Sequence, residues 1–403
     1  MGRIMIIAGG TWQVPLIRKA KSLGYEVVNS NLYEDSPGFK YSDFTEVCDV
    51  REKEKNLAIA RKYNVSGVLT DQSDIAVPTV AYVAEKMKCP TIGCAMAELF
   101  TNKFKMREFC IENGFDSPEY QLCETVDKAV DFFNILNQKV VIKPLDSQSS
   151  RGVFTIENIK ELKEKFPISQ EFSNGSEMVL IERYISGKEF TIDGISFKGK
   201  HYSLAISEKS HFEYNRNIAS ELLFSYDNEN YDYDQLRQIH NDLIEKTGLQ
   251  FGLTHAEYKY ENGKFYLIEM AARGGGTKIA SDIVPYMSGI DTYKILIDSA
   301  MGNVSKENLD FTILEKYRKR WAVLRFLDIE SNGKAITSIK GVDDIKNLEA
   351  VKDFSLEFTV GDIVARAQDD RSRVGYYIAY GESKDEINSV TEKVENLLKI
   401  SFN

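Results

Sequence analysis

The hydrophobic pattern of the first ninety residues alternates between short apolar runs and amphipathic segments. The runs that predict buried strands are RIMIIAGG (3–10), YEVVNSN (25–31), EVCDV (46–50) and VSGVLTD (65–71). The segments with apolar residues at helical spacing are VPLIRKAKSLG (14–24), EKEKNLAIARKYN (52–64) and AVPTVAYVAEKM (76–87). Strand and helix in strict turn predict a parallel, doubly wound α/β sheet.

Beyond residue 95 the strict alternation ends. Residues 98–115 combine helical spacing with lysines near the start and a glycine near the end, which predicts one helix. Short strands surround a polar loop within residues 120–190, and the last region combines short strands with a final amphipathic helix. At roughly 150 residues per domain, the chain is long enough for two or three domains. We expect three, over residues 1–95, 96–307 and 308–403.

Composition changes this picture mainly by exclusion. The chain has 403 residues and a formal net charge of −10, which argues against nonspecific binding to nucleic acid or anionic membranes. Its five cysteines and four histidines show no zinc-site spacing. No apolar run approaches the ~20 residues needed to span a bilayer, and RIMIIAGG is too short for a secretion signal. We expect a soluble, cytoplasmic protein.

Two strand ends of the N-terminal sheet carry candidate binding residues, because open parallel sheets bind ligands beyond the carboxyl ends of their strands. The first, AGGTWQ, contains Trp12 and Gln13, and the second, TDQSD, contains Ser73 and Asp74. AGGTWQ lacks the spaced glycine triplet of dinucleotide-binding folds, so NAD binding is disfavoured. Asp71 and Asp74 also suit turns and helix caps, and this second interpretation stays open.

The stretch THAEYKYENGKFYLIEMAAR predicts a β-hairpin with its turn at Asn262–Gly263. With a two-residue turn, Glu257 would face Ile268, and Glu257 and Glu269 would point to opposite sides. We expect instead a three-residue loop that includes Glu261, which puts both glutamates on one face, about one diagonal step apart. Two carboxylates at that range repel unless a cation lies between them, and oxygen ligands suit Mg²⁺. Chance placement on a hairpin is the alternative.

Arg273 and the three glycines after it end this hairpin with a guanidinium and an uncovered backbone. Arginine binds carboxylate or phosphate groups through two parallel hydrogen bonds. Glycines at 274–276 let backbone amides approach an anion closely. The pattern predicts an anion site, with a tight turn plus a structural salt bridge as the alternative.

A polar loop, KPLDSQSSRGV, follows the apolar strand that ends at Lys143. Its polar and small residues include Ser147, Ser149, Ser150, Arg151 and Gly152. Such a loop offers backbone and hydroxyl donors to phosphate and can close as a lid. It is not a Walker loop, which needs a lysine directly after a glycine. A flexible polar loop is the alternative.

Taken together, these features resemble the ATP-grasp superfamily over nearly the whole chain. Their order is a lysine at a helix start, a lysine at a strand end, a polar lid, a paired-glutamate hairpin, and an arginine with glycines. The resemblance is to the biotin carboxylase and carbamoyl-phosphate synthase branch, especially its stand-alone carboxylate–amine ligases, such as L-amino acid ligases. The C-terminal SRVGYYIAYGESKDEI is similar to the last domain of that branch.

The resemblance implies what each of the three expected domains is. Residues 1–95 would be a Rossmann-like pre-ATP-grasp domain of the α/β class. Residues 96–307 would be an α+β ATP-grasp domain with a mobile lid at about 117–187. Residues 308–403 would be a small α+β C-terminal domain.

Matched position by position, the resemblance implies a nucleotide site. Lys103 and Lys143 resemble the lysines that hold the ATP phosphates. The residues that resemble the lid are Ser147, Ser149, Ser150, Arg151, Gly152 and Val153. The residues that resemble the adenine and ribose contacts are Glu182, the backbone of Arg183 and Ile185, and Glu189.

The same resemblance implies a metal and catalytic site. Glu257 and Glu269 would bind one or two Mg²⁺ ions, with Mn²⁺ as an alternative, and Arg273 would steady an acyl phosphate and the substrate carboxylate. Lys143, Glu269 and Arg273 are the expected catalytic residues. The family usually has asparagine two residues after the second glutamate, where this chain has Ala271, so the number of metal ions stays open.

The implied reaction joins a carboxylate to an amine at the expense of ATP. The carboxylate attacks the γ-phosphate, ADP leaves, and the amine displaces phosphate from the acyl phosphate to form an amide or peptide-like bond. An amino acid is expected as one substrate. Two alternatives stay open: a carboxylase-like or nucleotide-precursor enzyme that uses bicarbonate or a one-carbon acid, and a nucleotide-binding module without turnover.

Further residues are candidates for substrate contacts by position. They are Ser73, Asp74, Lys209, Arg216, Arg273, Gly275 and Gly276, together with Trp12 and Gln13. Lys209 and Arg216 lie in ISEKSHFEYNRNIASE, a polar stretch that either covers the site or is a solvated loop. Related ligases lead us to expect a homodimer.

Overall fold

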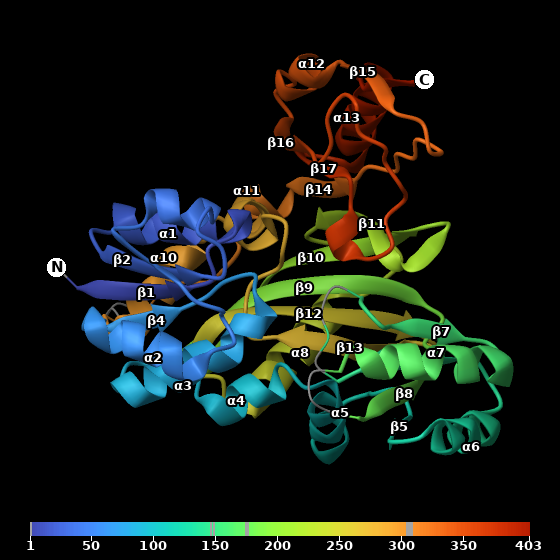
Figure 1. Cartoon of the computed structure of the whole chain (residues 1–403), viewed down its shortest axis with the longest axis horizontal. Coiled ribbons are helices and arrows are strands. Elements are labelled where there is room, and N and C mark those ends of the chain that lie inside the picture. Colours follow the sequence, from blue (N-terminus) through green and yellow to red (C-terminus); the bar gives the residue numbers. More distant parts are fainter. Residues whose placement is uncertain (1, 146, 148–149, 174–176, 304–308) are drawn as a thin grey trace.

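The computed structural model describes residues 2–145, 147, 150–173, 177–303 and 309–403. These residues form three lobes around a long central sheet (Figure 1). In that view the N-terminal lobe lies at the left, a smaller lobe with β5, β7 and β8 at the lower right, and the C-terminal lobe at the top.

The N-terminal lobe contains a parallel sheet in the order β3-β2-β1-β4. Its strands are β1 (Arg3–Ile7), β2 (Glu26–Asn31), β3 (Phe44–Val47) and β4 (Gly67–Leu69). Its helices are α1 (Val14–Ser22), α2 (Lys53–Lys62) and α3 (Val77–Met87). Alternate residues of a strand face opposite sides, so Ile4 and Ile6 pack with α1 while Met5 and Ile7 pack with α2 and α3. The predicted doubly wound sheet is confirmed.

The central sheet is antiparallel and has the order β13-β12-β9-β10-β11-β14-β17-β16. Its first five strands along the chain are β9 (Lys188–Phe197), β10 (Lys200–Phe212), β11 (Asn215–Ser225), β12 (Phe251–Glu261) and β13 (Lys264–Ala271). The others are β14 (Trp321–Phe326), β16 (Val351–Leu356) and β17 (Gly375–Gly381). Because β11 pairs with β14, strands of the C-terminal region extend the sheet of the central region.

Two helices cover one face of this sheet. They are α5 (Lys103–Glu112) and α8 (Tyr233–Thr247), whose apolar residues pack on Phe190, Ile192 and Tyr258. The single helix expected over 98–115 is interrupted, because α4 (Cys94–Leu99) ends before α5 begins. The side chain of Asn102 accepts a hydrogen bond from the Lys105 backbone amide at 3.1 Å and so caps α5. This cap sets Lys103 at the start of the helix.

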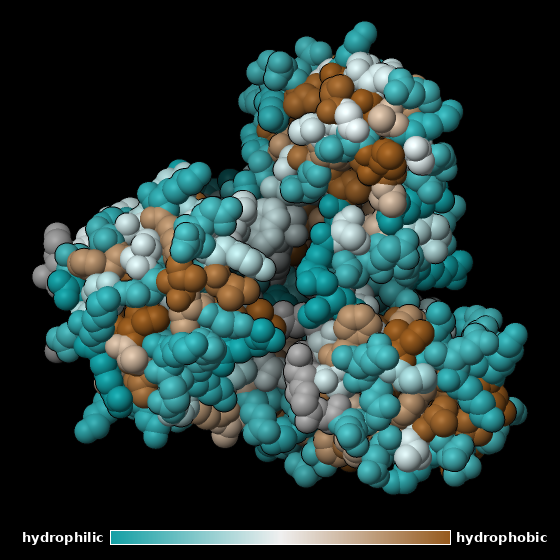
Figure 2. Space-filling model, in the orientation of Figure 1, coloured by the Kyte–Doolittle hydropathy of each residue, from teal (hydrophilic) through white to brown (hydrophobic). Residues whose placement is uncertain are grey.

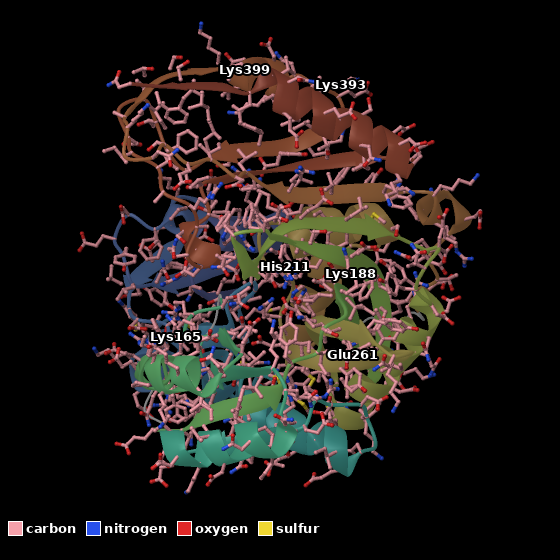
Figure 3. All side chains as sticks on the ribbon, turned by 90° about the vertical axis from the view of Figure 1, so that its right-hand side faces the viewer. Lys165, Lys188, His211, Glu261, Lys393 and Lys399 are labelled. Atoms are coloured by element: carbon pink, nitrogen blue, oxygen red, sulfur yellow. The ribbon has the colours of Figure 1, made fainter. Side chains whose placement is uncertain are left out.

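The smaller lobe has its own sheet, in the order β5-β8-β6-β7. Its strands are β5 (Tyr120–Cys123), β6 (Val140–Pro144), β7 (Phe154–Ile156) and β8 (Val179–Arg183), and its helices are α6 (Val126–Leu136) and α7 (Ile159–Glu171). Phe132, Ile142 and Phe166 share one core with the other apolar residues of this lobe. The view in Figure 3 places Lys165 on its outer side, away from Lys188 on the central sheet.

The C-terminal lobe packs α12 (Val342–Lys346) and α13 (Lys384–Leu397) against one face of β14, β16 and β17. A two-stranded sheet of β15 (Ile336–Lys340) and β18 (Lys399–Phe402) lies beside them. The other α-helices of the described residues are α9 (Val284–Ser288), α10 (Thr292–Ala300) and α11 (Glu315–Arg318). Within the described ranges, no helix is long and apolar enough to cross a bilayer. The cytoplasmic location and the exact domain limits stay predictions.

Candidate active site

The β12–β13 hairpin carries both glutamates on one face, but by a different route from the one predicted. Asn262 and Gly263 have positive φ angles of 52° and 84° and form a two-residue turn, with Glu261 paired to Lys264. The ladder then shifts register between Tyr258 and Glu257, so Ile268 becomes an extra residue of β13. Glu257 therefore lies directly opposite Glu269. The predicted three-residue loop is wrong, and the bulge restores the shared face.

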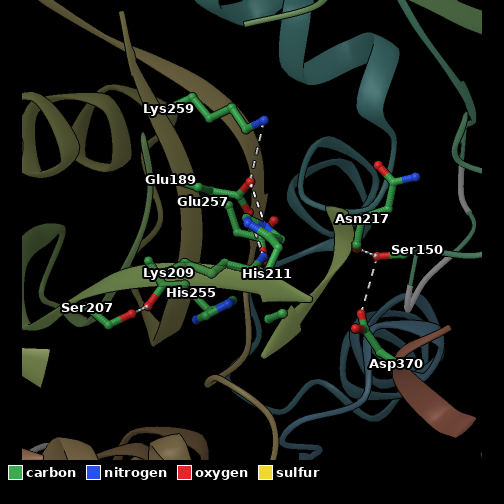
Figure 4. A network of polar contacts seen from close by, with 12 residues as sticks. Ser150, Glu189, Ser207, Lys209, His211, Asn217, His255, Glu257, Lys259 and Asp370 are labelled. Atoms are coloured by element: carbon green, nitrogen blue, oxygen red, sulfur yellow. Dashed lines mark hydrogen bonds and ion pairs between the residues drawn. The ribbon is translucent and has the colours of Figure 1, made fainter. Parts of the chain in front are cut away.

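Each of these glutamates contacts a lysine ammonium. Lys103 Nζ lies 2.9 Å from Glu269 Oε1, and Lys209 Nζ lies 2.8 Å from Glu257 Oε1. Lys209 Nζ also lies 2.6 Å from Glu189 Oε1, so this ammonium joins the two carboxylates (Figure 4). The stretch ISEKSHFEYNRNIASE, expected to be a cover over the site or a solvated loop, instead forms parts of β10 and β11. Lys209 therefore lies on the polar face of the sheet.

The charges of this cluster compensate one another. Burial by itself would raise the pKa values of Glu189 and Glu257, but the Lys209 ammonium holds both below their usual range. Glu189 also lies 3.3 Å from His211 Nε2 and 3.7 Å from Lys259 Nζ. Burial opposes the charge of Lys209, yet the two carboxylates raise its pKa above the usual value. The site is therefore a set of carboxylates already neutralised by cations.

The donor set fits Mg²⁺ only if a ligand supplies further oxygens. Among the described residues there is no group of three or more His, Cys, Asp or Glu side chains arranged to hold a metal. Ala271, the position of the family's asparagine, is buried directly opposite His255 and offers no ligand atom. Two facing carboxylates nevertheless suit Mg²⁺, which is usually bound by one or two protein carboxylates plus phosphate oxygens and water.

Lys143 belongs to a buried ion cluster that includes an unpredicted member, Arg107. Glu182 accepts from Arg107 Nε at 2.7 Å, and its other oxygen lies 2.5 Å from Lys143 Nζ. Burial lowers the pKa of Lys143, and the Glu182 carboxylate only partly offsets this. Burial alone would raise the pKa of Glu182, but the two cations lower it. Arg107 could have been suspected from the sequence only as a charge within a helix.

The loop predicted to cover phosphate lies beside these lysines. Lys103 Nζ donates to the Ser147 carbonyl at 2.8 Å, and Ser147 Oγ donates to the Arg151 carbonyl at 2.9 Å. Ser150 Oγ lies 3.0 Å from the Asn217 carbonyl and 3.3 Å from Asp370 Oδ2, so it joins the small lobe to the other two (Figure 4).

The other predicted nucleotide residues lie nearby. Ser149 lies outside the described residues. Gly152 has a φ of 71°, and a Cβ there would lie 2.8 Å from Pro144. The Val153 amide donates to the Ser150 carbonyl. Arg183 pairs with Glu119 and Glu261, each at 2.6 Å, and the buried Ile185 carbonyl accepts from Lys259.

Arg273 makes two parallel hydrogen bonds to Asp74, at 2.8 and 2.7 Å, across the boundary between the central sheet and the N-terminal lobe. Burial disfavours the charge of Arg273, but Asp74 raises its pKa above the usual value. The structural salt bridge considered as the alternative is thus present in this structure. The Gly274 and Gly275 amides donate to buried carboxylates, at 2.8 and 3.1 Å, which are those of Asp71 and Asp193.

All three parts of the chain line one cavity of about 710 Å³. The predicted residues that line it are Trp12, Asp74, Ser150, Lys209, Glu257, Glu269, Arg273 and Gly276. Figure 2 shows the surface hollowed where the three lobes meet. Gln13 is buried and donates to the Asp71 carbonyl at 2.7 Å, and Gly275 is covered by Asp193. Ser73 is not among the lining residues, and neither is the exposed Arg216.

The structure adds lining residues that sequence reasoning missed. They include Gln72, Thr191, His255, Phe326, Glu357, Arg371, Arg373 and Tyr376. His255 Nδ1 lies 2.9 Å from Asp193 Oδ1, and the Arg373 guanidinium stacks 3.7 Å from the centre of the Phe326 ring. No local spacing signals these residues, because all of them except His255 come from segments that are far from the hairpin in the sequence.

Comparison with known protein families agrees with this geometry. Residues 136–282 match the model of the ATP-grasp domain. The chain contains an ATP-grasp domain. Residues 325–403 also match the model of L-amino acid ligase C-terminal domain 2. The cavity lies between these two matched regions and the N-terminal lobe.

Similar proteins share the fold more clearly than the sequence. The L-amino acid ligase from Bacillus licheniformis has a crystal structure that matches with a TM-score of 0.83 and 20% identity, covering 100% of this chain and 99% of that one. Formate-dependent phosphoribosylglycinamide formyltransferase of Wolinella succinogenes is 24% identical over 184 residues, 45% of this chain and 48% of that protein. Dapdiamide A synthase of Enterobacter agglomerans is 24% identical over 43% of this chain and 42% of that protein. The chain thus spans about half the length of these curated relatives.

Proposed function

We propose that this ATP-grasp protein is an ADP-forming carboxylate–amine ligase with an amino acid as one substrate. The observation that carries the proposal is the direct pairing of Glu257 with Glu269 at a cavity that also contains Arg273. Paired carboxylates that could hold Mg²⁺, beside a guanidinium, suit the negative charge on the phosphate oxygens when phosphate is transferred to a carboxylate. The matches to an L-amino acid ligase fold and to dapdiamide A synthase support the choice of substrate class.

The proposed reaction has two displacements. A substrate carboxylate oxygen attacks the γ-phosphorus of ATP, the bond from that phosphorus to the bridging oxygen breaks, and ADP leaves. The amine nitrogen then attacks the acyl carbon, the bond from carbon to the phosphate oxygen breaks, and inorganic phosphate and a proton are released. Both steps depend mainly on positioning and charge neutralisation, so no covalent protein nucleophile is required.

The residues of this chain divide that work. Glu257 and Glu269 would hold Mg²⁺, which supplies positive charge to the phosphate oxygens when it is bound. Lys103 would neutralise phosphate charge after leaving Glu269, which it contacts in this structure. Lys143 would do the same from its buried position beside Glu182. Arg273 would hold the acyl phosphate and the substrate carboxylate. Whether one or two metal ions bind depends on the ligand oxygen that is missing at Ala271.

The nucleotide would lie between the small lobe and the central sheet. Glu182, with the backbone of Arg183 and Ile185, would contact adenine, and Glu189 would contact the ribose. The loop with Ser147, Ser149, Ser150, Arg151, Gly152 and Val153 would cover the phosphates and exclude water from the acyl phosphate.

We also infer a homodimer and a cytoplasmic location; light scattering of the purified protein tests the first, and cell fractionation the second.

A second candidate function is an enzyme that activates formate or bicarbonate. It is favoured by the sequence similarity to formate-dependent phosphoribosylglycinamide formyltransferases. It predicts ADP release with a one-carbon acid in the absence of amino acids.

Nucleotide product analysis tests these proposals. The protein is incubated with ATP, Mg²⁺ and pools of amino acids, other carboxylates, formate or bicarbonate, and ADP, AMP and phosphate are measured. ADP and phosphate that appear only with a carboxylate plus an amine support the ligase. AMP and pyrophosphate would refute an acyl-phosphate mechanism. Tight ATP binding without product in any pool would favour a binding module, and Glu269→Gln serves as the control for contaminating ATPase.

A further inference from the structure

Two chemically different kinds of side chain line the cavity. One kind consists of the charged groups described above, including Arg373, whose guanidinium stacks on the Phe326 ring. The other kind, here named the apolar wall, consists of Trp12, Ala219, Leu222, Ala271, Ile279, Leu324, Phe326 and Tyr376. None of these side chains takes part in the proposed phosphate or metal contacts. An apolar surface that faces a cavity gains free energy when an apolar ligand group covers it.

The centre of the apolar wall is one face of the central sheet. Leu222 lies directly opposite Leu324, and Phe326 lies directly opposite Tyr376. Their neighbours along the strands, such as Leu223 and Val323, point to the other face and pack with α13. The wall is therefore held in place by paired strands, as a shape-selective pocket requires.

Two aromatic residues close one corner of the wall. Trp12, from the N-terminal lobe, lies edge-on to Tyr376, with ring centres 5.7 Å apart and planes at 64°. The Tyr376 hydroxyl donates to Asp353 Oδ2, which Lys278 also contacts at 2.6 Å, so its polar end is satisfied by those two residues. Within the described part of the chain, the Trp12 indole N–H makes no hydrogen bond. Both rings are available to pack against an apolar group.

The apolar wall begins beside the paired glutamates. Ala271 lies two residues after Glu269 on the same face of β13, about 6.8 Å further along the strand, and it lines the cavity. A methyl group therefore stands where the family usually has a polar asparagine. A ligand whose carboxylate reaches Arg273 can extend its adjacent substituent along the wall.

We propose that the apolar wall is the side-chain pocket of the carboxylate substrate, and that it selects α-amino acids with large apolar side chains over small or charged ones. This inference rests on the proposed ligase function and narrows its substrate class. Trp12, Leu222 and Tyr376 are then specificity-determining residues. One missing methylene in an apolar pocket typically lowers kcat/KM about tenfold or more. The kcat/KM for phenylalanine or leucine should therefore exceed that for alanine by at least about a hundredfold.

The test isolates the carboxylate step by using hydroxylamine as the amine. Hydroxylamine traps an acyl phosphate as a hydroxamate, so the natural amine need not be known. ADP and hydroxamate are measured with phenylalanine, leucine, alanine and aspartate for the wild type and for Trp12→Ala, Leu222→Ala and Leu223→Ala. Leu223→Ala is the matched control, because it is the same truncation on the opposite face of β11. Thermal unfolding of each variant identifies any that fail to fold.

We expect Trp12→Ala and Leu222→Ala to raise KM for phenylalanine and leucine about tenfold, with a smaller change for alanine. Leu223→Ala should lower the unfolding temperature without changing the ratio of kcat/KM for phenylalanine to kcat/KM for alanine. ADP and hydroxamate formed equally well from alanine or aspartate would overturn this inference and leave the ligase standing. Equal effects of Leu222→Ala and Leu223→Ala on that ratio would also overturn it. No ADP with any acid would refute the ligase proposal, and this inference with it.

Discussion

Replacing Lys209 by methionine tests whether the paired glutamates form a cation site. The Lys209 ammonium lies 2.6 Å from Glu189 and 2.8 Å from Glu257, and its side chain is only 12% exposed. Methionine keeps the volume of the side chain but removes the charge. Breaking a buried ion pair by removing one partner costs about 3–5 kcal/mol. Glu189 keeps Lys259 and His211, and Glu257 is 26% exposed, so we expect the lower end, about 3 kcal/mol.

The assay is urea unfolding followed by tryptophan fluorescence, first with EDTA and then with 10 mM MgCl₂. In the variant, the uncompensated carboxylates should bind Mg²⁺ without nucleotide. A dissociation constant of about 1 mM would restore about 1.4 kcal/mol at about 10 mM ion. Mg²⁺ should raise the free energy of unfolding of the wild type by less, because the metal must first displace the Lys209 ammonium. Lys188→Met is the matched control, since Lys188 pairs with Glu208 at 2.6 Å in the same sheet.

The pH dependence gives a second check on the same variant. Burial alone would raise the pKa of Glu257, but Lys209 depresses it below the ordinary value of 4.5. A depressed carboxylate pKa contributes stability that is present above pH 4.5 and is lost as pH falls through the folded-state pKa. The stability gap between wild type and Lys209→Met should therefore narrow below pH 4.5. Equal stability at neutral pH, or an equal response to Mg²⁺ in both proteins, would refute the reasoning.

Three further predictions concern single positions. Glu269→Gln should reduce ADP formation at least about a hundredfold in a coupled assay while the unfolding temperature stays within a few degrees; unchanged turnover would remove the metal site. Gly275→Ala should lower the free energy of unfolding by about 1–3 kcal/mol, because the new Cβ would lie 2.7 Å from Asp193 Oδ1, whereas Gly276→Ala meets open space and should be neutral in urea unfolding. Burial lowers the pKa of His201 from 6.5 to about 3. Below pH 6.5 the unfolded chain therefore binds a proton at His201 that the folded chain does not bind. The free energy of unfolding should fall by about 1.4 kcal/mol for each pH unit below pH 6.5, and His201→Asn should reduce this slope.

Local patterns sufficed for the N-terminal lobe and for the identity of the charged residues. Strand and helix periodicity in the first ninety residues is a short-range property, so the doubly wound sheet could be predicted without tertiary contacts. The turn at Asn262–Gly263 was equally local. The bulge at Ile268 was not predictable, because register is set by how both strands pack in the whole sheet. The sequence alone therefore predicted correctly that Glu257 and Glu269 share a face, but through the wrong loop.

The order of amino acids establishes which chemical groups the protein has and where they lie along the chain. Only the folded structure brings particular groups next to one another. Pairing of β11 with β14 brings Phe326 and Tyr376 to the cavity that holds Glu257. The same fold moves Lys209 from an expected loop into an ion cluster between two carboxylates. The physical reason is that contacts between distant strands depend on the burial and charge balance of the whole assembly, which no local spacing encodes.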